Sequence, residues 1–80
     1  MVSQETINEA VKRLAKFYNP LKIYLYGDYA HGIPNEESSV RFLIVVAESD
    51  EEIMRRSYLG FEILLELYMP KNIVVFTQKD

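Results

Sequence analysis

The chain has 80 residues, a formal net charge of −3, one histidine and no cysteine. That length fills a single domain, residues 1–80, and the missing cysteines exclude a disulfide scaffold and a thiolate metal site. Residues 28–52 contain seven acids and one lysine or arginine. A nucleic-acid-binding surface needs clustered lysines and arginines, so this segment does not have the charge of one. No apolar run is long enough for a membrane span and no signal peptide is recognisable, so we expect a cytoplasmic protein that binds neither membrane nor nucleic acid.

The first predicted element is an amphipathic helix that begins after Ser3 and ends at Asn19-Pro20. Its apolar residues recur at the i, i+3, i+4, i+7 spacing of a one-faced helix, and Ser3 is a favourable N-cap. Residues 21–26 alternate aliphatic with larger amphipathic side chains, which predicts a strand ended by Gly27.

Residues 28–38 are predicted to be loop with one helical turn at the start. Residues 40–46 form a second strand, and the continuous apolar run 42–46 predicts burial on both faces. The loop between these two strands is too short for a crossover helix, so they should pair antiparallel.

A capping box at Ser49 and Glu52 opens a predicted helix of about 18 residues that ends before Pro70. Residues 72–77 form the third strand, which should lie parallel to the second after a right-handed crossover. The sequence therefore predicts an α/β (α+β) fold, a small mixed sheet of about three strands with helices packed on it, in the order helix, strand, turn, strand, helix, strand.

The predicted long helix is apolar nearly all round between residues 58 and 69. A helix of this kind is normally buried on more than one side. One interpretation is an interface with a partner or a second copy; the other is a core helix with scattered surface apolar residues. The interface interpretation assigns the contact to five residues: Tyr58, Leu59, Phe61, Leu65 and Tyr68.

No residue pattern predicts a metal site. His31 is expected to be a loop histidine without a chemical role. Glu36 and Glu37 are adjacent, so their carboxylates diverge, whereas a hard cation needs oxygens that converge. The acids at 50–52 are explained by the positive end of the following helix. Gly27 followed by a helical turn has the shape of a phosphate site, but the Asp28 carboxylate would repel a phosphate.

The segment from Leu25 to Val46 resembles the minimal nucleotidyltransferases of the DNA polymerase beta-like superfamily. The family pattern is Gly-Ser-x-Ala-x-Gly, then about ten residues after the serine, then Asp-x-Asp and an apolar strand. This chain has Gly27, Ala30 and Gly32 at matching places, and the resemblance extends over about residues 21–77. It implies the same order of elements and a nucleotidyltransferase-like core.

The family's functional residues do not carry over. Its three carboxylates hold Mg²⁺ for transfer of a nucleoside monophosphate, and the matching positions here are Ser39, Arg41 and Asn72. The position of the family's triphosphate-binding serine is Asp28. The resemblance therefore implies that no catalytic metal is bound, and Asp28 and Arg41 are expected to form a salt bridge that closes the pocket.

The expected function is a catalytically silent nucleotidyltransferase-like domain that acts through protein contacts and needs no cofactor. The resemblance suggests an antitoxin-like role with a helical HEPN-type partner, or association of two copies, through residues 58–69. The alternative is an active or nucleotide-binding enzyme that uses Mg²⁺ and a nucleoside triphosphate through displaced carboxylates such as Asp28, Glu36 or Glu37.

Overall fold

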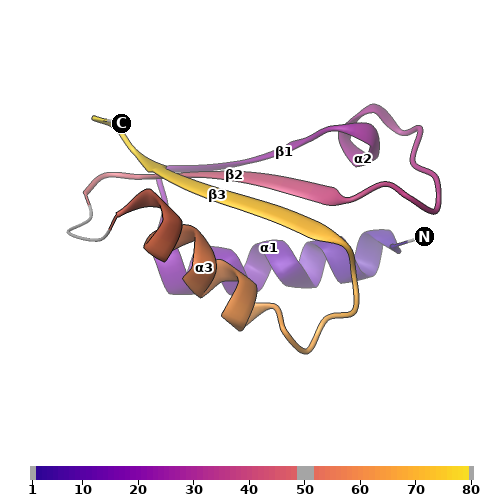
Figure 1. Ribbon diagram of the computed structural model, residues 1–80, viewed down its shortest axis with the longest axis horizontal. Helices are drawn as coiled ribbons and strands as arrows, with labels where there is room; N and C mark the ends of the chain where they lie inside the picture. Colours follow the sequence, from indigo (N-terminus) through magenta and orange to yellow (C-terminus); the bar gives the residue numbers. More distant parts are fainter. Residues whose placement is uncertain (1, 49–51, 80) are drawn as a thin grey trace.

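The computed structural model describes residues 2–48 and 52–79 and has the predicted α+β class (Figure 1). The described elements, in chain order, are α1 (Gln4–Tyr18), β1 (Lys22–Tyr26), α2 (Asp28–His31), β2 (Val40–Val46), α3 (Ile53–Ile63) and β3 (Lys71–Thr77). None of these helices is long and apolar enough to cross a membrane.

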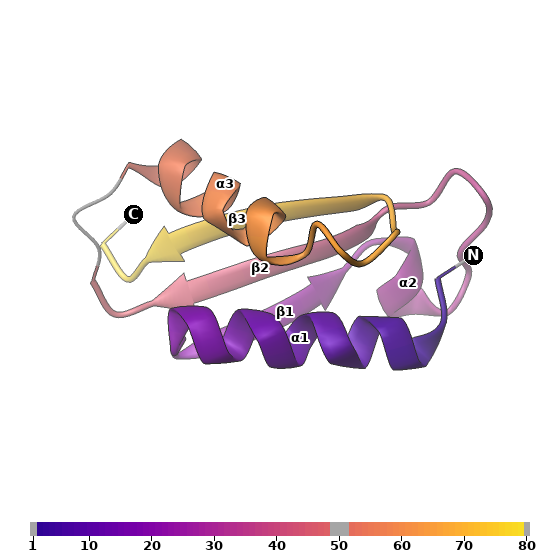
Figure 2. The ribbon, with the colours of Figure 1, turned by 90° about the horizontal axis from the view of Figure 1, so that it is seen from below.

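The three strands form one mixed sheet with β2 in the centre. β1 pairs with β2 antiparallel and β3 pairs with β2 parallel, which confirms both predicted pairings. Figures 1 and 2 show α1 and α3 on the same face of this sheet, so the described part of the molecule has two layers.

The core lies between the two long helices and the sheet. Val40, Phe42, Ile44 and Val46 point from β2 toward the helices and are buried. The residues between them are different: Leu43 and Val45 are only partly buried and Arg41 is exposed. The prediction that this strand is buried on both faces is therefore wrong for the described chain, because both helices pack on one side.

The bounds of α1 agree with those predicted from the residues at its two ends. The Ser3 hydroxyl oxygen accepts a hydrogen bond from the Thr6 backbone N–H, as expected of an N-cap. The helix ends at Asn19, whose φ of 47° lies in the left-handed region that asparagine tolerates better than most residues. Pro20 then prevents the helix from continuing.

α3 is shorter than predicted. It has 11 residues and ends at Ile63, after which Leu65 and Leu67 donate backbone hydrogen bonds three residues back, to Glu62 and Leu64. Continued to residue 69, the helix would be about 9 Å longer. Instead the chain turns back, and the carbonyl oxygen of Pro70 accepts a bond from the Val40 N–H at the start of β2.

The N-terminus of α3 also differs from the prediction. Glu52 is its N-cap, and no side-chain hydrogen bond caps it. The predicted capping residue, Ser49, lies outside the described residues.

A glycine allows α3 to approach the rest of the core closely. A Cβ at Gly60 would lie 2.9 Å from Cγ2 of Ile73 and 3.0 Å from the Tyr18 hydroxyl oxygen. That hydroxyl donates a hydrogen bond to the carbonyl oxygen of Arg56, and burial raises the pKa of Tyr18 to about 12. Tyr18 and Gly60 thus fix the contact between the end of α1 and the middle of α3.

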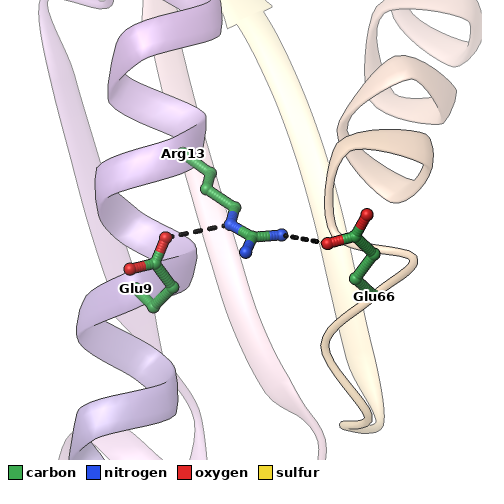
Figure 3. A network of polar contacts seen from close by, with 3 residues as sticks. All are labelled: Glu9, Arg13 and Glu66. Carbon is green, nitrogen blue, oxygen red and sulfur yellow. Dashed lines mark hydrogen bonds and ion pairs between the residues drawn. The ribbon is translucent and has the colours of Figure 1, made fainter.

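A charged network joins α1 to the turn after α3 (Figure 3). Nε of Arg13 lies 2.9 Å from a Glu9 carboxylate oxygen, and one of its terminal nitrogens lies 3.5 Å from Glu66. The hydrogen bond with Glu9 raises the pKa of the Arg13 guanidinium. Because the Glu66 side chain is largely exposed, this network contributes little to stability.

Candidate functional site

The candidate site lies where β1 ends and the chain turns through α2. Gly27 makes the turn with φ 82° and ψ −158°, a conformation that favours glycine. A Cβ there would also lie 3.0 Å from Cδ of Arg41 on the neighbouring strand. Glycine is therefore required both for the backbone angle and for the close approach of the Arg41 side chain.

α2 is a single turn that follows this glycine. The carbonyl oxygen of Gly27 accepts hydrogen bonds from the N–H groups of Ala30 and His31, and Gly32 ends the turn in the left-handed conformation. His31 is exposed at the end of the turn. The predicted turn at the start of the loop is confirmed.

The loop that follows is tied back to Asp28 by a buried serine. The Ser38 hydroxyl donates to Oδ2 of Asp28 at 2.6 Å and accepts from the Asn35 N–H at 2.9 Å. The Asn35 side-chain oxygen in turn accepts from the Glu37 N–H at 2.8 Å. These bonds give the loop a defined shape and hold the Asp28 carboxylate against it.

A pocket of about 430 Å³ opens between this loop, α2 and the start of β2. Its lining residues are Gly27, Asp28, Asn35, Glu37, Ser38, Ser39 and Arg41. Four of them (Gly27, Asp28, Ser39 and Arg41) are predicted site residues, so the fold does bring these positions together.

The fifth predicted position, Asn72, does not line this pocket. It is the register partner of Arg41 on the adjacent strand β3, and so it belongs to the same corner of the sheet. Sequence reasoning missed Asn35 and Ser38 as site residues. The signal was present, because asparagine and serine in a short loop commonly bond to nearby backbone groups.

The prediction of a salt bridge between Asp28 and Arg41 is wrong. The Asp28 carboxylate bonds to Ser38 instead, and no ion pair joins it to Arg41 in the described structure. The Arg41 guanidinium carbon lies 6.0 Å from the centroid of the Tyr26 ring, in cation–π range. Tyr26 is the register partner of Arg41, and the Arg41 side chain lies against Gly27 in the pocket lining without an ion pair to Asp28.

The residues at the implied metal positions do not fit Mg²⁺. Magnesium is held through carboxylate oxygens and phosphates, whereas Ser39 supplies a hydroxyl, Asn72 an amide and Arg41 a cation. Within residues 2–48 and 52–79, no three His, Cys, Asp or Glu side chains gather in a group that could hold a metal ion. Of the displaced carboxylates, Asp28 and Glu37 line the pocket and Glu36 does not.

The five predicted interface residues do not all behave alike. Tyr58, Leu65 and Tyr68 are 55%, 70% and 98% exposed, although the last two lie in the turn after α3 and not in a helix. Phe61 is partly buried against the core, and Leu59 lines a separate cavity of about 180 Å³ with Tyr18. Three of the five therefore present apolar surface outward.

The chain has no significant match among protein-family models, curated proteins or solved structures.

Proposed function

We propose that this chain is a nucleotidyltransferase-like domain that has lost its catalytic metal site and acts through contacts with another protein. The single observation that supports this most is the pocket itself. Gly27, Asp28, Ser39 and Arg41 line one pocket between β1 and β2. By the resemblance, Arg41 stands where the family has a metal-binding aspartate.

The charges of the pocket oppose a triphosphate. Asp28 and Glu37 add two carboxylates to the lining, and Arg41 supplies one cation. Without Mg²⁺, the single cation of this lining is outnumbered by its two carboxylates and cannot compensate a triphosphate that carries several negative charges, and like charges repel. Metal ions supply several kcal/mol of transition-state stabilisation in such reactions, and each 1.36 kcal/mol is a factor of ten in rate.

A second candidate function is nucleotide binding or transfer through displaced carboxylates with Mg²⁺. The observation that favours it is that Asp28 and Glu37 both line the pocket. The hydrogen bond from Ser38 to Asp28 weakens this alternative, because one carboxylate oxygen already serves the loop.

Under the first proposal, the partner is a helical protein of the HEPN type or a second copy of this chain, in an antitoxin-like role. The exposed side chains of Tyr58, Leu65 and Tyr68 are the contact surface suggested by the sequence. A cytoplasmic location, as expected from the sequence, is part of this proposal.

Thermal unfolding in the presence of Mg²⁺ and a nucleoside triphosphate separates the two candidates. A ligand that binds only the folded state stabilises it by RT ln(1 + [L]/Kd), about 2.7 kcal/mol at a hundredfold excess over Kd. For a domain of this size, each kcal/mol moves Tm by about 4–8 °C. We expect no change in Tm at millimolar Mg²⁺ with ATP or GTP. A magnesium-dependent rise in Tm would refute the silent-domain proposal.

A further inference from the structure

One face of the sheet carries apolar surface that no described element covers. Figure 1 shows α1 and α3 on one face of the sheet. Alternation along the paired strands places nine side chains on the other face. They are Lys22, Tyr24, Tyr26, Arg41, Leu43, Val45, Asn72, Val74 and Phe76. We call this set the open face. Tyr24 and Tyr26 are 46% and 38% exposed, and the four aliphatic and phenyl side chains are partly exposed.

The sequence of β2 is that of a strand covered on both sides. Residues 42–46 are continuously apolar, and such runs are typical of parallel sheets with helices on both faces. The helices among the described residues cover one face only. Leu43 and Val45 of β2, and Val74 and Phe76 of the parallel strand β3, are thus the apolar residues that a second layer would bury.

The charge of the open face selects the kind of partner. Across the three strands, all of which lie in the described residues, the open face carries two cations and no acid. Nζ of Lys22 lies 5.9 Å from the Tyr24 ring centroid, and Arg41 stacks similarly on Tyr26. Asp28 and Glu37 line the pocket together with Arg41. Two copies joined through this face would bring four cations together, which disfavours self-association.

The size of the open face fits one helix. Strands of seven residues span about 23 Å and three strands are about 14 Å wide. A helix of about 15 residues has the same length and is about 10 Å in diameter. Addition of a strand at the β3 edge is disfavoured, because the Ser57 hydroxyl of α3 already accepts the outward N–H of Val75.

We infer that the open face binds an amphipathic helix of a partner protein, which buries its apolar side on Leu43, Val45 and Val74 and places carboxylates against Lys22 and Arg41. This inference rests on the proposal that the chain acts through protein contacts, and it assigns those contacts to the sheet rather than to the turn after α3. A single-stranded nucleic acid is less favoured, because binding of that kind uses many phosphate contacts and this face has two cations.

The test uses two synthetic helical peptides and the isotope-labelled chain. Both peptides have 15 residues and leucines on one side; one carries two glutamates seven positions apart beside the leucines, and the other carries lysines at the same two positions. We expect the glutamate peptide to shift the amide resonances of Tyr24, Leu43 and Val74, and the lysine peptide to bind about tenfold more weakly, since two exposed ion pairs are worth about 1 kcal/mol or slightly more.

Charge-swap variants supply the matched control. Lys22→Glu with Arg41→Glu should reverse the preference between the two peptides. Lys12→Glu with Lys16→Glu makes the same change in net charge at exposed positions of α1 and should leave the preference as it is.

Four results would overturn the inference. If the peptides shifted the resonances of Tyr58, Leu65 and Tyr68 instead of those of the open face, the proposal of protein contacts would hold, but the contact surface would be the one around these three residues. If neither peptide bound, the open face would not be a helix-binding site. Shifts of the open face with protein concentration alone would indicate a second copy, and shifts with oligouridine but not with peptide would indicate nucleic acid. The proposed function fails separately, through a magnesium-dependent rise in Tm with nucleotide.

Discussion

The interaction between Asp28 and Ser38 gives the sharpest test of how the pocket is built. Ser38 is buried, and its hydroxyl donates to the Asp28 carboxylate at 2.6 Å while accepting the Asn35 N–H. Ser38→Ala removes both bonds, and we expect it to lower the free energy of unfolding by about 1–2 kcal/mol, since a hydrogen bond to a charged group is worth more than a neutral one. For 80 residues this corresponds to a fall in Tm of about 4–16 °C.

A double-mutant cycle isolates the pair. Urea unfolding of Asp28→Ala, Ser38→Ala and the double variant should show a coupling energy of about 1 kcal/mol, reduced from the value for a fully buried pair because Asp28 is exposed. The matched cycle of Asp28→Ala with Arg41→Ala should show a coupling below about 0.5 kcal/mol. Ser39→Ala, at the other serine of the pocket lining, is the control for loss of a hydroxyl.

The opposite ranking of the two cycles would refute this reasoning. A large coupling between Asp28 and Arg41, with none between Asp28 and Ser38, would restore the salt bridge expected from the sequence and would show that Arg41 points across the pocket.

Two further predictions concern the contact between α1 and α3. Gly60→Ala should destabilise the protein by about 1–3 kcal/mol in urea unfolding, although alanine is the better helix former by about 1 kcal/mol, because its Cβ would lie 2.9 Å from Ile73; a variant as stable as the natural chain would contradict this packing. Because the pKa of Tyr18 is raised to about 12 in the folded state from a usual value near 10, the protonated phenol favours folding below pH 10 and this contribution is lost as the pH rises toward 12. Stability measured across that range should fall more steeply for the natural chain than for Tyr18→Phe, and equal slopes would argue against a buried Tyr18 hydroxyl.

Elements set by local chemistry were predictable from the sequence. Ser3 as a cap, Asn19-Pro20 as a stop and Gly27 at the end of β1 each act within one turn of chain, and each lies where it was predicted. The strand pairings followed from the length of the two connections, which leaves few topologies open.

Features that depend on tertiary packing were not predictable in the same way. The apolar run to Met69 has the composition of a helix, yet α3 ends at Ile63 because the chain has to return to the start of β3. The apolar run 42–46 does not reveal which of its faces is covered. In the pocket, four of the five predicted positions lie together in the lining, but the predicted partner of Asp28 was wrong, because loop geometry brings Ser38 to its carboxylate.

The central proposal is that Ser39, Arg41 and Asn72 stand at positions where the resembled family has metal ligands, and introducing carboxylates there tests it most directly. Arg41 and Asn72 are register partners, and Ser39 lies two residues before Arg41, so three aspartates would converge at one corner of the sheet. Titration of Mg²⁺ by calorimetry should give no binding heat with the natural chain and saturable binding with Ser39→Asp, Arg41→Asp and Asn72→Asp combined, provided that circular dichroism shows the variant folded. Saturable binding to the natural chain, or a folded variant that binds no Mg²⁺, would contradict the account.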